Sequence, residues 1–124
     1  MLRKIDCVLV RVDDLQAGVD FYTRAFGLRP RWRDDVSAGL GLPETDAEIV
    51  VHTMDLPDEF GVHYLVDDVS EAVAAYVRSG CAIRVAPFDI AIGRCAVVDD
   101  PFGNAVCVLD LSKGPRPHFQ LMGD

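Results

Sequence analysis

The sequence is short of positive charge. It contains 12 lysines and arginines against 20 aspartates and glutamates, and its formal net charge is −8. Proteins that bind the nucleic-acid backbone or an anionic membrane surface do so through basic faces. The charge balance therefore argues against both kinds of partner, and we expect neither nucleic acid nor membrane among the partners of this chain.

Long apolar runs and closely spaced cysteines are also missing. No stretch of the sequence is long enough to cross a bilayer, and the apolar run near the start is far shorter than the core of a signal peptide. The cysteines show no CxxC spacing that would indicate a disulfide framework or a zinc ribbon. We expect reduced thiols and a cytoplasmic location for the four cysteines, Cys7, Cys81, Cys95 and Cys107.

Apolar residues, by contrast, make up half of the 124 residues, which is enough to bury a core. The length fits a single domain over residues 1–124. Within it, residues 12–24 (VDDLQAGVDFYTR) align without gaps with residues 66–78 (VDDVSEAVAAYVR). The two segments begin about half a chain length apart, which indicates two copies of one supersecondary unit.

Each copy contains the signals for the start of a helix. Asp13 with Gln16 in the first copy, and Asp68 with Glu71 in the second, have the spacing of a capping box. The apolar residues that follow recur with helical periodicity in both copies. We therefore predict one helix per copy and interpret the aspartate pairs as helix caps rather than as acid/base dyads.

Glycines and strand-forming segments follow each helix. Gly27 and Gly80 stand where a left-handed helix end is expected. A strand precedes each helix and three follow it, which predicts an α+β fold of two βαβββ modules in a curved mixed sheet, with the helices on its outer face. The modules are expected at about 4–55 and 60–112, followed by an irregular tail at 113–124.

Side chains alternate between the two faces of a strand. Val8, Val10 and Val12 form the uniformly branched face of the first strand and should pack under its helix. The opposite faces of the strands should line a cup, which is the default place for a small-molecule site. The candidate ligand-binding residues on that face are Cys7, Leu9, Glu48, His52, His63, Leu65, Cys107 and Leu109.

Three stretches of the sequence have a familiar pattern: VDDLQAGVDFYTRAFGLRP, VHYLVDDVSEAV and DDPFGNAVCVLDL. With the paired modules, they resemble the vicinal oxygen chelate superfamily, which includes glyoxalase I, bleomycin-resistance proteins and extradiol dioxygenases. The resemblance implies a homodimer and a divalent metal (Zn, Ni, Mn or Fe) that is chelated by substrate oxygens.

The family's metal ligands, carried over position by position, fall on Cys7, Gly61, Cys107 and about Val50. None of these is the residue that the family uses. We therefore expect a protein that binds a small molecule in the cavity without the usual metal and without another cofactor, as bleomycin-resistance proteins do. A cysteine on an apolar strand is more often a small buried hydrophobe than a metal ligand.

Two enzymatic alternatives remain open. The first is a metal-dependent enzyme of the glyoxalase or dioxygenase type, with a rearranged ligand set of Cys7, His63 and Cys107. The second is a metal-free isomerase or hydrolase that uses His52 or His63 as its base. The structural interpretation of His52 and Glu48 places both at a sheet edge or at the rim of the cup.

Overall fold

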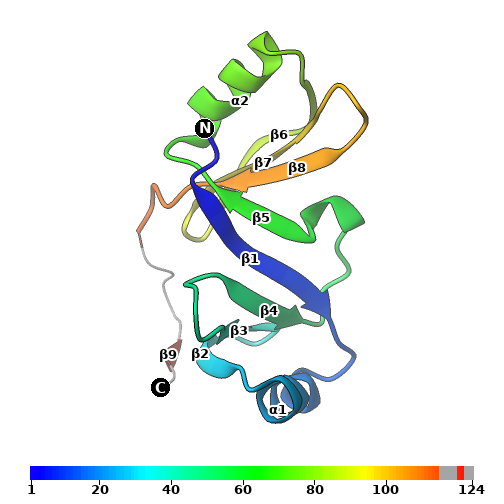
Figure 1. Cartoon of the computed structure of the whole chain (residues 1–124), viewed down its shortest axis with the longest axis vertical. Helices are drawn as coiled ribbons and strands as arrows, with labels where there is room; N and C mark the ends of the chain where they lie inside the picture. The colour runs from blue at the N-terminus through cyan, green and yellow to red at the C-terminus, as the bar shows by residue number, and fades with distance from the viewer. Residues whose placement is uncertain (115–119, 122–124) are drawn as a thin grey trace. The chain divides into compact units, whose positions relative to one another are not determined.

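The computed structural model describes residues 1–114 and 120–121, which form two compact units (Figure 1). The first unit contains residues 6–57 together with 120–121, and the second contains residues 1–5 and 58–114. Each unit consists of a mixed sheet and one α-helix. No helix in the described residues is long and apolar enough to span a membrane.

The first unit has the strand order β1-β4-β3-β2-β9. Its strands β1 and β4 are parallel, and the connection between them includes α1, β2 and β3. The other pairs, β4 with β3, β3 with β2 and β2 with β9, are antiparallel. The elements are β1 (Lys4–Arg11), α1 (Leu15–Phe26), β2 (Arg29–Arg33), β3 (Ser37–Gly41), β4 (Glu48–His52) and β9 (Gln120–Leu121).

The second unit repeats this plan with the strand order β6-β7-β8-β5. Its strands β5 and β8 are parallel, whereas β8 with β7 and β7 with β6 are antiparallel. A short 3-10 turn, η1, precedes β5. The elements are η1 (Asp58–Phe60), β5 (Val62–Leu65), α2 (Val69–Arg78), β6 (Ala82–Ile90), β7 (Gly93–Asp99) and β8 (Ala105–Leu109).

The predicted fold class, α+β with two βαβββ modules, is confirmed. The end of the chain adds one strand that the sequence does not predict. Gln120–Leu121 pair antiparallel with β2 inside the stretch 113–124, which was expected to be irregular. Two residues of backbone pairing need no periodic side-chain pattern, so the sequence contains no signal for this strand.

The two helices begin as predicted in one case and one residue later in the other. Asp68 caps α2 by accepting a hydrogen bond from the Glu71 N–H at 2.9 Å. The cap of α1 is Asp14, which accepts from the Ala17 N–H at 2.8 Å, so the predicted pair of Asp13 and Gln16 is wrong. Both aspartates have the right chemistry, and only the backbone conformation decides between them.

The helices cover the sheet faces that the alternation predicts. Val10 and Val12 pack with Val19 of α1 against the buried side chains of Leu40 and Val51. In the second unit, a matching cluster joins α2 to β5, β7 and β8. It consists of Val66, Val69, Ala72, Val73, Ala96, Val98 and Val108. The face of each sheet opposite its helix is called here the open face.

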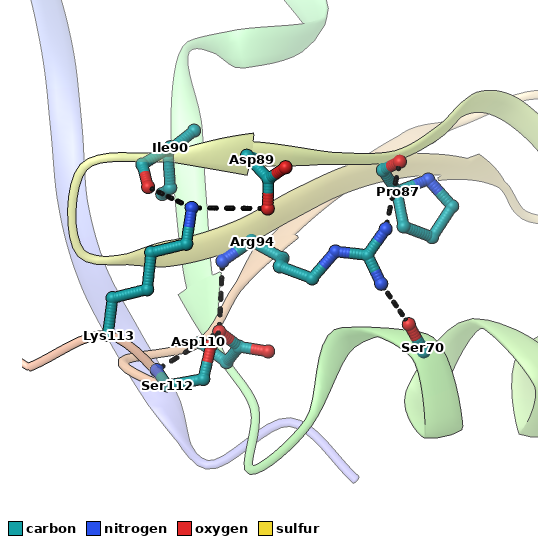
Figure 2. A network of polar contacts seen from close by, with 8 residues as sticks. All are labelled: Ser70, Pro87, Asp89, Ile90, Arg94, Asp110, Ser112 and Lys113. Atoms are coloured by element: carbon teal, nitrogen blue, oxygen red, sulfur yellow. Dashed lines mark hydrogen bonds and ion pairs between the residues drawn. The ribbon is translucent and has the colours of Figure 1, made fainter.

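A buried carboxylate ties the ends of three elements of the second unit together, and Figure 2 shows its bonds with Arg94 and Ser112. Asp110, which is 1 % exposed, follows β8 and accepts hydrogen bonds from the Val69 N–H of α2 and the Arg94 N–H of β7, each at 2.9 Å. The Ser112 hydroxyl donates a further bond at 2.7 Å. Gly93 makes room for this contact, because a Cβ there would lie 2.3 Å from an oxygen of that carboxylate.

Candidate functional site

The open face of the first unit brings four of the predicted residues onto two adjacent strands. Cys7 and Leu9 of β1 pack with Val50 of β4 against Trp32 of β2. Cys7 is 5 % exposed, so its thiol offers almost no surface to a ligand. Glu48 stands opposite Cys7 in the parallel register, and its Oε1 accepts a hydrogen bond from Trp32 Nε1 at 2.8 Å.

His52 is buried rather than placed at the rim of a cup. Its strand β4 lies between β1 and β3, so the interpretation of His52 and Glu48 as edge residues is wrong. His52 is 4 % exposed, and its Nδ1 accepts a hydrogen bond from the Met54 N–H at 3.1 Å. Burial, and then the positive charge of Arg11, lower the pKa of His52. The ring is therefore neutral at pH 7, and Nδ1 is already occupied as an acceptor.

The open face of the second unit collects the other four candidates. His63 stands opposite Cys107, and Leu65 opposite Leu109, in the parallel pairing of β5 with β8. Leu65, Cys107 and Leu109 are all nearly inaccessible, with Cys107 1 % exposed. The helix α2 lies on the opposite face, but apolar side chains of the same unit pack against this one, and they include Phe60, Val85 and Phe88.

Cys107 also contacts Cys95, a second buried cysteine of this unit. The Sγ atoms of Cys95 and Cys107 lie 3.5 Å apart across strands β7 and β8. The hydrogen bond with the Cys107 sulfur lowers the pKa of the Cys95 thiol, although burial opposes this change. The hairpin register around the DDPFGN turn is the signal that could have predicted the contact. No disulfide is present among the four cysteines, all of which are described.

The positions that the resemblance assigns to a metal are occupied by a glycine, a valine and two buried cysteines. Gly61 has no side chain, and Val50 is an apolar residue buried beside Cys7. Cys7 and Cys107 lie in separate units, each within an apolar cluster. Across the described residues, no group of three or more His, Cys, Asp or Glu side chains is arranged to hold a metal ion.

The second unit contains a hollow of about 580 Å³ that is lined by none of the eight predicted residues. Gly61 lies in its wall, at the position where the resemblance would place a metal-binding histidine. The hollow spans the start and middle of β5, the preceding η1 turn, β6 and the start of β8. Its walls include Asp58, Glu59, Gly61, Tyr64, Arg84 and Ala105.

Charged groups of both signs line this hollow. Arg84 is held by Asp99 at 2.7 Å and by Glu59 at 3.8 Å, and these carboxylates raise the pKa of its guanidinium. Asp58 adds a second carboxylate to the lining, and Tyr64 adds an aromatic ring with a hydroxyl. Sequence reasoning missed this arrangement, because Arg84 and Glu59 are 25 residues apart and meet only through the folding of β6.

These features define an α+β protein of paired βαβββ units whose sheets each have one helix-covered and one open face. The model of the Glyoxalase/Bleomycin resistance protein/Dioxygenase superfamily matches residues 4–108. The chain therefore belongs to this superfamily, as its motifs indicate. No curated protein matches the sequence significantly.

Solved structures share this fold at low sequence identity. A variant of methylmalonyl-CoA epimerase from Streptomyces coelicolor, in complex with 2-nitronate-propionyl-CoA, has a TM-score of 0.70 at 17% identity, covering 94% of this chain and 100% of that chain. For methylmalonyl-CoA epimerase from Mycobacterium tuberculosis the values are 0.64 and 19%, covering 88% of each chain. An uncharacterised protein from Methanosarcina mazei has a TM-score of 0.64 at 15% identity, covering 94% of this chain and 98% of that chain.

Proposed function

We propose that this protein binds a small organic molecule in the hollow beside Gly61, without a metal at the four family positions. The observation that supports it most directly is the combination of an open hollow at Gly61 with apolar burial at Cys7, Val50 and Cys107. The lack of a side chain at Gly61 leaves space for a ligand. At the other three family positions, packing among apolar side chains disfavours the binding of a metal ion. The same residues thus favour a binding pocket over a metal centre.

The walls of the hollow supply a mixture of contacts suited to a polar ligand. Arg84 and the carboxylates of Asp58 and Glu59 can orient charged groups, and Tyr64 offers a flat apolar surface with a hydroxyl at its end. The variant of methylmalonyl-CoA epimerase from Streptomyces coelicolor was solved with 2-nitronate-propionyl-CoA. From that relative we carry over only that this fold accommodates an organic ligand.

The first test of the proposal is metal analysis combined with a fragment screen. We expect less than stoichiometric divalent metal after purification without added metal. We also expect fragments detected by protein-observed NMR to shift the amides of Gly61, Tyr64 and Gly103. A Gly61→Leu variant should lose these shifts because its side chain enters the hollow. Ala82→Leu, an exposed position on β6 outside the lining, is the matched control and should keep them.

Two results would overturn the proposal. One is a single bound divalent metal per chain that is lost in a Cys107→Ala variant, which would support the rearranged metal site. The other is a fragment screen in which no compound shifts the amides of the hollow in the wild-type protein.

The resemblance also leads us to propose a homodimer, and the pattern of the cysteines leads us to propose a reducing, cytoplasmic compartment. The four cysteines are free thiols, a state that such a compartment maintains.

A further inference from the structure

Strand β2 contains an irregularity centred on an arginine. In its antiparallel pairing with β3, Pro30 stands opposite Leu40 and Trp32 opposite Gly39, so two steps along β2 match one step along β3. Arg31 is therefore the extra residue of a β-bulge. A bulge changes the direction of the side chain that it inserts, and bulges are over-represented next to binding sites.

Glycines on β3 make space for the side chains of the bulge. A Cβ on Gly41 would lie 2.1 Å from Arg31 Nε, and a Cβ on Gly39 would lie 2.0 Å from Trp32 Nε1. Gly39 and Gly41 are two apart on one strand and share a face, so Arg31 and Trp32 lie over the same face of β3. The bulge thus turns Arg31 onto the face where a regular strand would not place it beside Trp32.

Arg31 and its neighbour Arg29 line a second hollow, of about 410 Å³, in the first unit. Among the residues that the structure describes, the rest of the lining comes from Leu42 and Pro43, directly after β3. The hollow therefore has a wall with two guanidinium groups and a wall of apolar side chains. It shares no lining residue with the hollow beside Gly61.

The arginines of the described residues differ in their partners, and Arg24 and Arg78, which line neither hollow, lack a side-chain ion pair or hydrogen bond just as Arg29 and Arg31 do. Arg3, Arg11 and Arg84 each form an ion pair with an aspartate. In contrast, the side chains of Arg29 and Arg31 make no ion pair or hydrogen bond with any residue that the structure describes. Acidic residues outnumber basic ones by 20 to 12 in this chain, so carboxylate partners are not scarce. What sets Arg29 and Arg31 apart from Arg24 and Arg78 is that they line the same hollow, and two guanidinium groups in one hollow of an acidic protein favour a binding site for an external anion.

We propose that this hollow binds the phosphate group of a small organic phosphate monoester. Guanidinium groups bind phosphate oxygens through paired hydrogen bonds, and two of them balance the charge of a dianion. Leu42 and Pro43 would contact the organic part of the molecule. A free carboxylate matches the charge of only one of the two arginines and should bind more weakly.

Phenyl phosphate is a suitable probe because it combines a dianion with an apolar ring. Titrations followed by NMR at low ionic strength should give saturable shifts at Arg29, Arg31 and Leu42. We expect inorganic phosphate, benzoate and phenol to bind more weakly. Inorganic phosphate lacks the ring, benzoate lacks the second negative charge, and phenol lacks the anionic group. Binding should weaken as salt is added, because partly exposed ion pairs are screened.

Three variants separate the proposed site from general electrostatics. Arg29→Gln and Arg31→Gln should each weaken the binding of phenyl phosphate by about tenfold, as expected for the loss of a charge-assisted hydrogen bond. Gly41→Ala should weaken it as well, because the added methyl group displaces the Arg31 side chain. The matched control is Arg24→Gln on α1, which removes the same charge outside the hollow and should leave the affinity unchanged.

The proposal fails if phenyl phosphate does not bind at millimolar concentration, or if Arg24→Gln weakens it as much as Arg31→Gln does. It also fails if phenol binds equally well, since the site would then be an apolar patch. Because Arg29 is exposed and Arg31 half-buried, both glutamine variants should fold, and a wild-type Trp32 fluorescence spectrum confirms this for each.

Discussion

Asp110 shows how one residue can hold several elements in place. Its carboxylate is buried, yet it accepts hydrogen bonds from three parts of the second unit: the start of α2, the start of β7 and the turn after β8. Figure 2 shows the bonds from Arg94 and Ser112. Burial acts to raise the pKa of Asp110, but the bonds from Val69, Ser112 and Arg94 together lower it below its ordinary value. The charged form is thus the one that the fold requires.

Replacing Asp110 with asparagine should destabilise the protein by about 1.5–3 kcal/mol, the range for hydrogen bonds to charged groups. The amide nitrogen of asparagine would face a backbone N–H, and at least one donor would lose its partner. Urea unfolding measures the change. Asp89→Asn is the control, because its ion pair with Lys113 is exposed and should contribute less than about 1 kcal/mol. Equal losses in the two variants would contradict this role for Asp110.

The lowered pKa values of His52 and Asp110 predict two separate pH ranges of stability loss. For both groups the unfolded state binds a proton at a higher pH than the folded state does, so the free energy of unfolding falls as the pH falls. The His52 contribution should start to disappear below about pH 6.5 and that of Asp110 below about pH 4, their ordinary values. Urea unfolding between about pH 8 and pH 5 should show a slope that His52→Gln removes. An unchanged slope in that variant would contradict the assignment.

Gly39 is the glycine whose replacement should be most visible, because a Cβ there overlaps the ring of Trp32. Gly39→Ala should displace the ring, break its hydrogen bond to Glu48 and cost about 1–3 kcal/mol, as overpacking does. Trp32 is the single tryptophan of the chain, so its fluorescence reports the change directly. Gly61→Ala, where a Cβ meets only a backbone oxygen at 3.2 Å, is the control and should leave the emission unchanged.

At the scale of elements, the start of α1 distinguishes two adjacent aspartates with the same chemistry. Asp14 accepts the bond from the Ala17 N–H, whereas Asp13 forms an exposed ion pair with Arg11. Asp14→Ala should therefore cost about 1 kcal/mol, the usual value of an N-cap, and Asp13→Ala should cost less than half of that. Thermal unfolding monitored by circular dichroism measures both. The reverse order would restore the capping box that the sequence predicts at Asp13.

The β2–β3 pair shows why the prediction of strands from the sequence does not predict the hollow that Arg31 lines. Both strands, Arg29–Arg33 and Ser37–Gly41, are among the three that the sequence predicts after the first helix. The bulge at Arg31 is not readable from the same residues, because a bulge depends on how one strand aligns with its neighbour. A shift of one residue decides whether Arg31 lies over β3 or points away from it.

At the scale of the whole molecule, the family resemblance predicts the association of two chains. Sedimentation equilibrium should give a mass twice that of the chain across micromolar concentrations. A mass equal to that of a single chain over this range would contradict the homodimer. The measurement is independent of both proposed binding sites, since each is lined by residues of one unit of a single chain.

The sequence by itself determined the repeat, the fold class, the superfamily and the face on which most strand residues lie. These properties depend on local periodicity, on capping and turn chemistry, and on motifs that can be read along the chain. Together with the family resemblance, the sequence also predicts that the positions of the usual metal ligands are occupied by Cys7, Gly61 and Cys107 instead. Only the tertiary structure decided which side chains far apart in the sequence contact one another.

The contact of Cys95 with Cys107, the burial of His52, the Asp110 network and both hollows belong to this second class. Each depends on strand register and on the packing of segments far apart in the sequence. Cysteines, histidines and arginines have the same chemistry in either register. Only their neighbours in space determine whether they fill a core, as Cys107 does, or line a hollow, as Arg31 does.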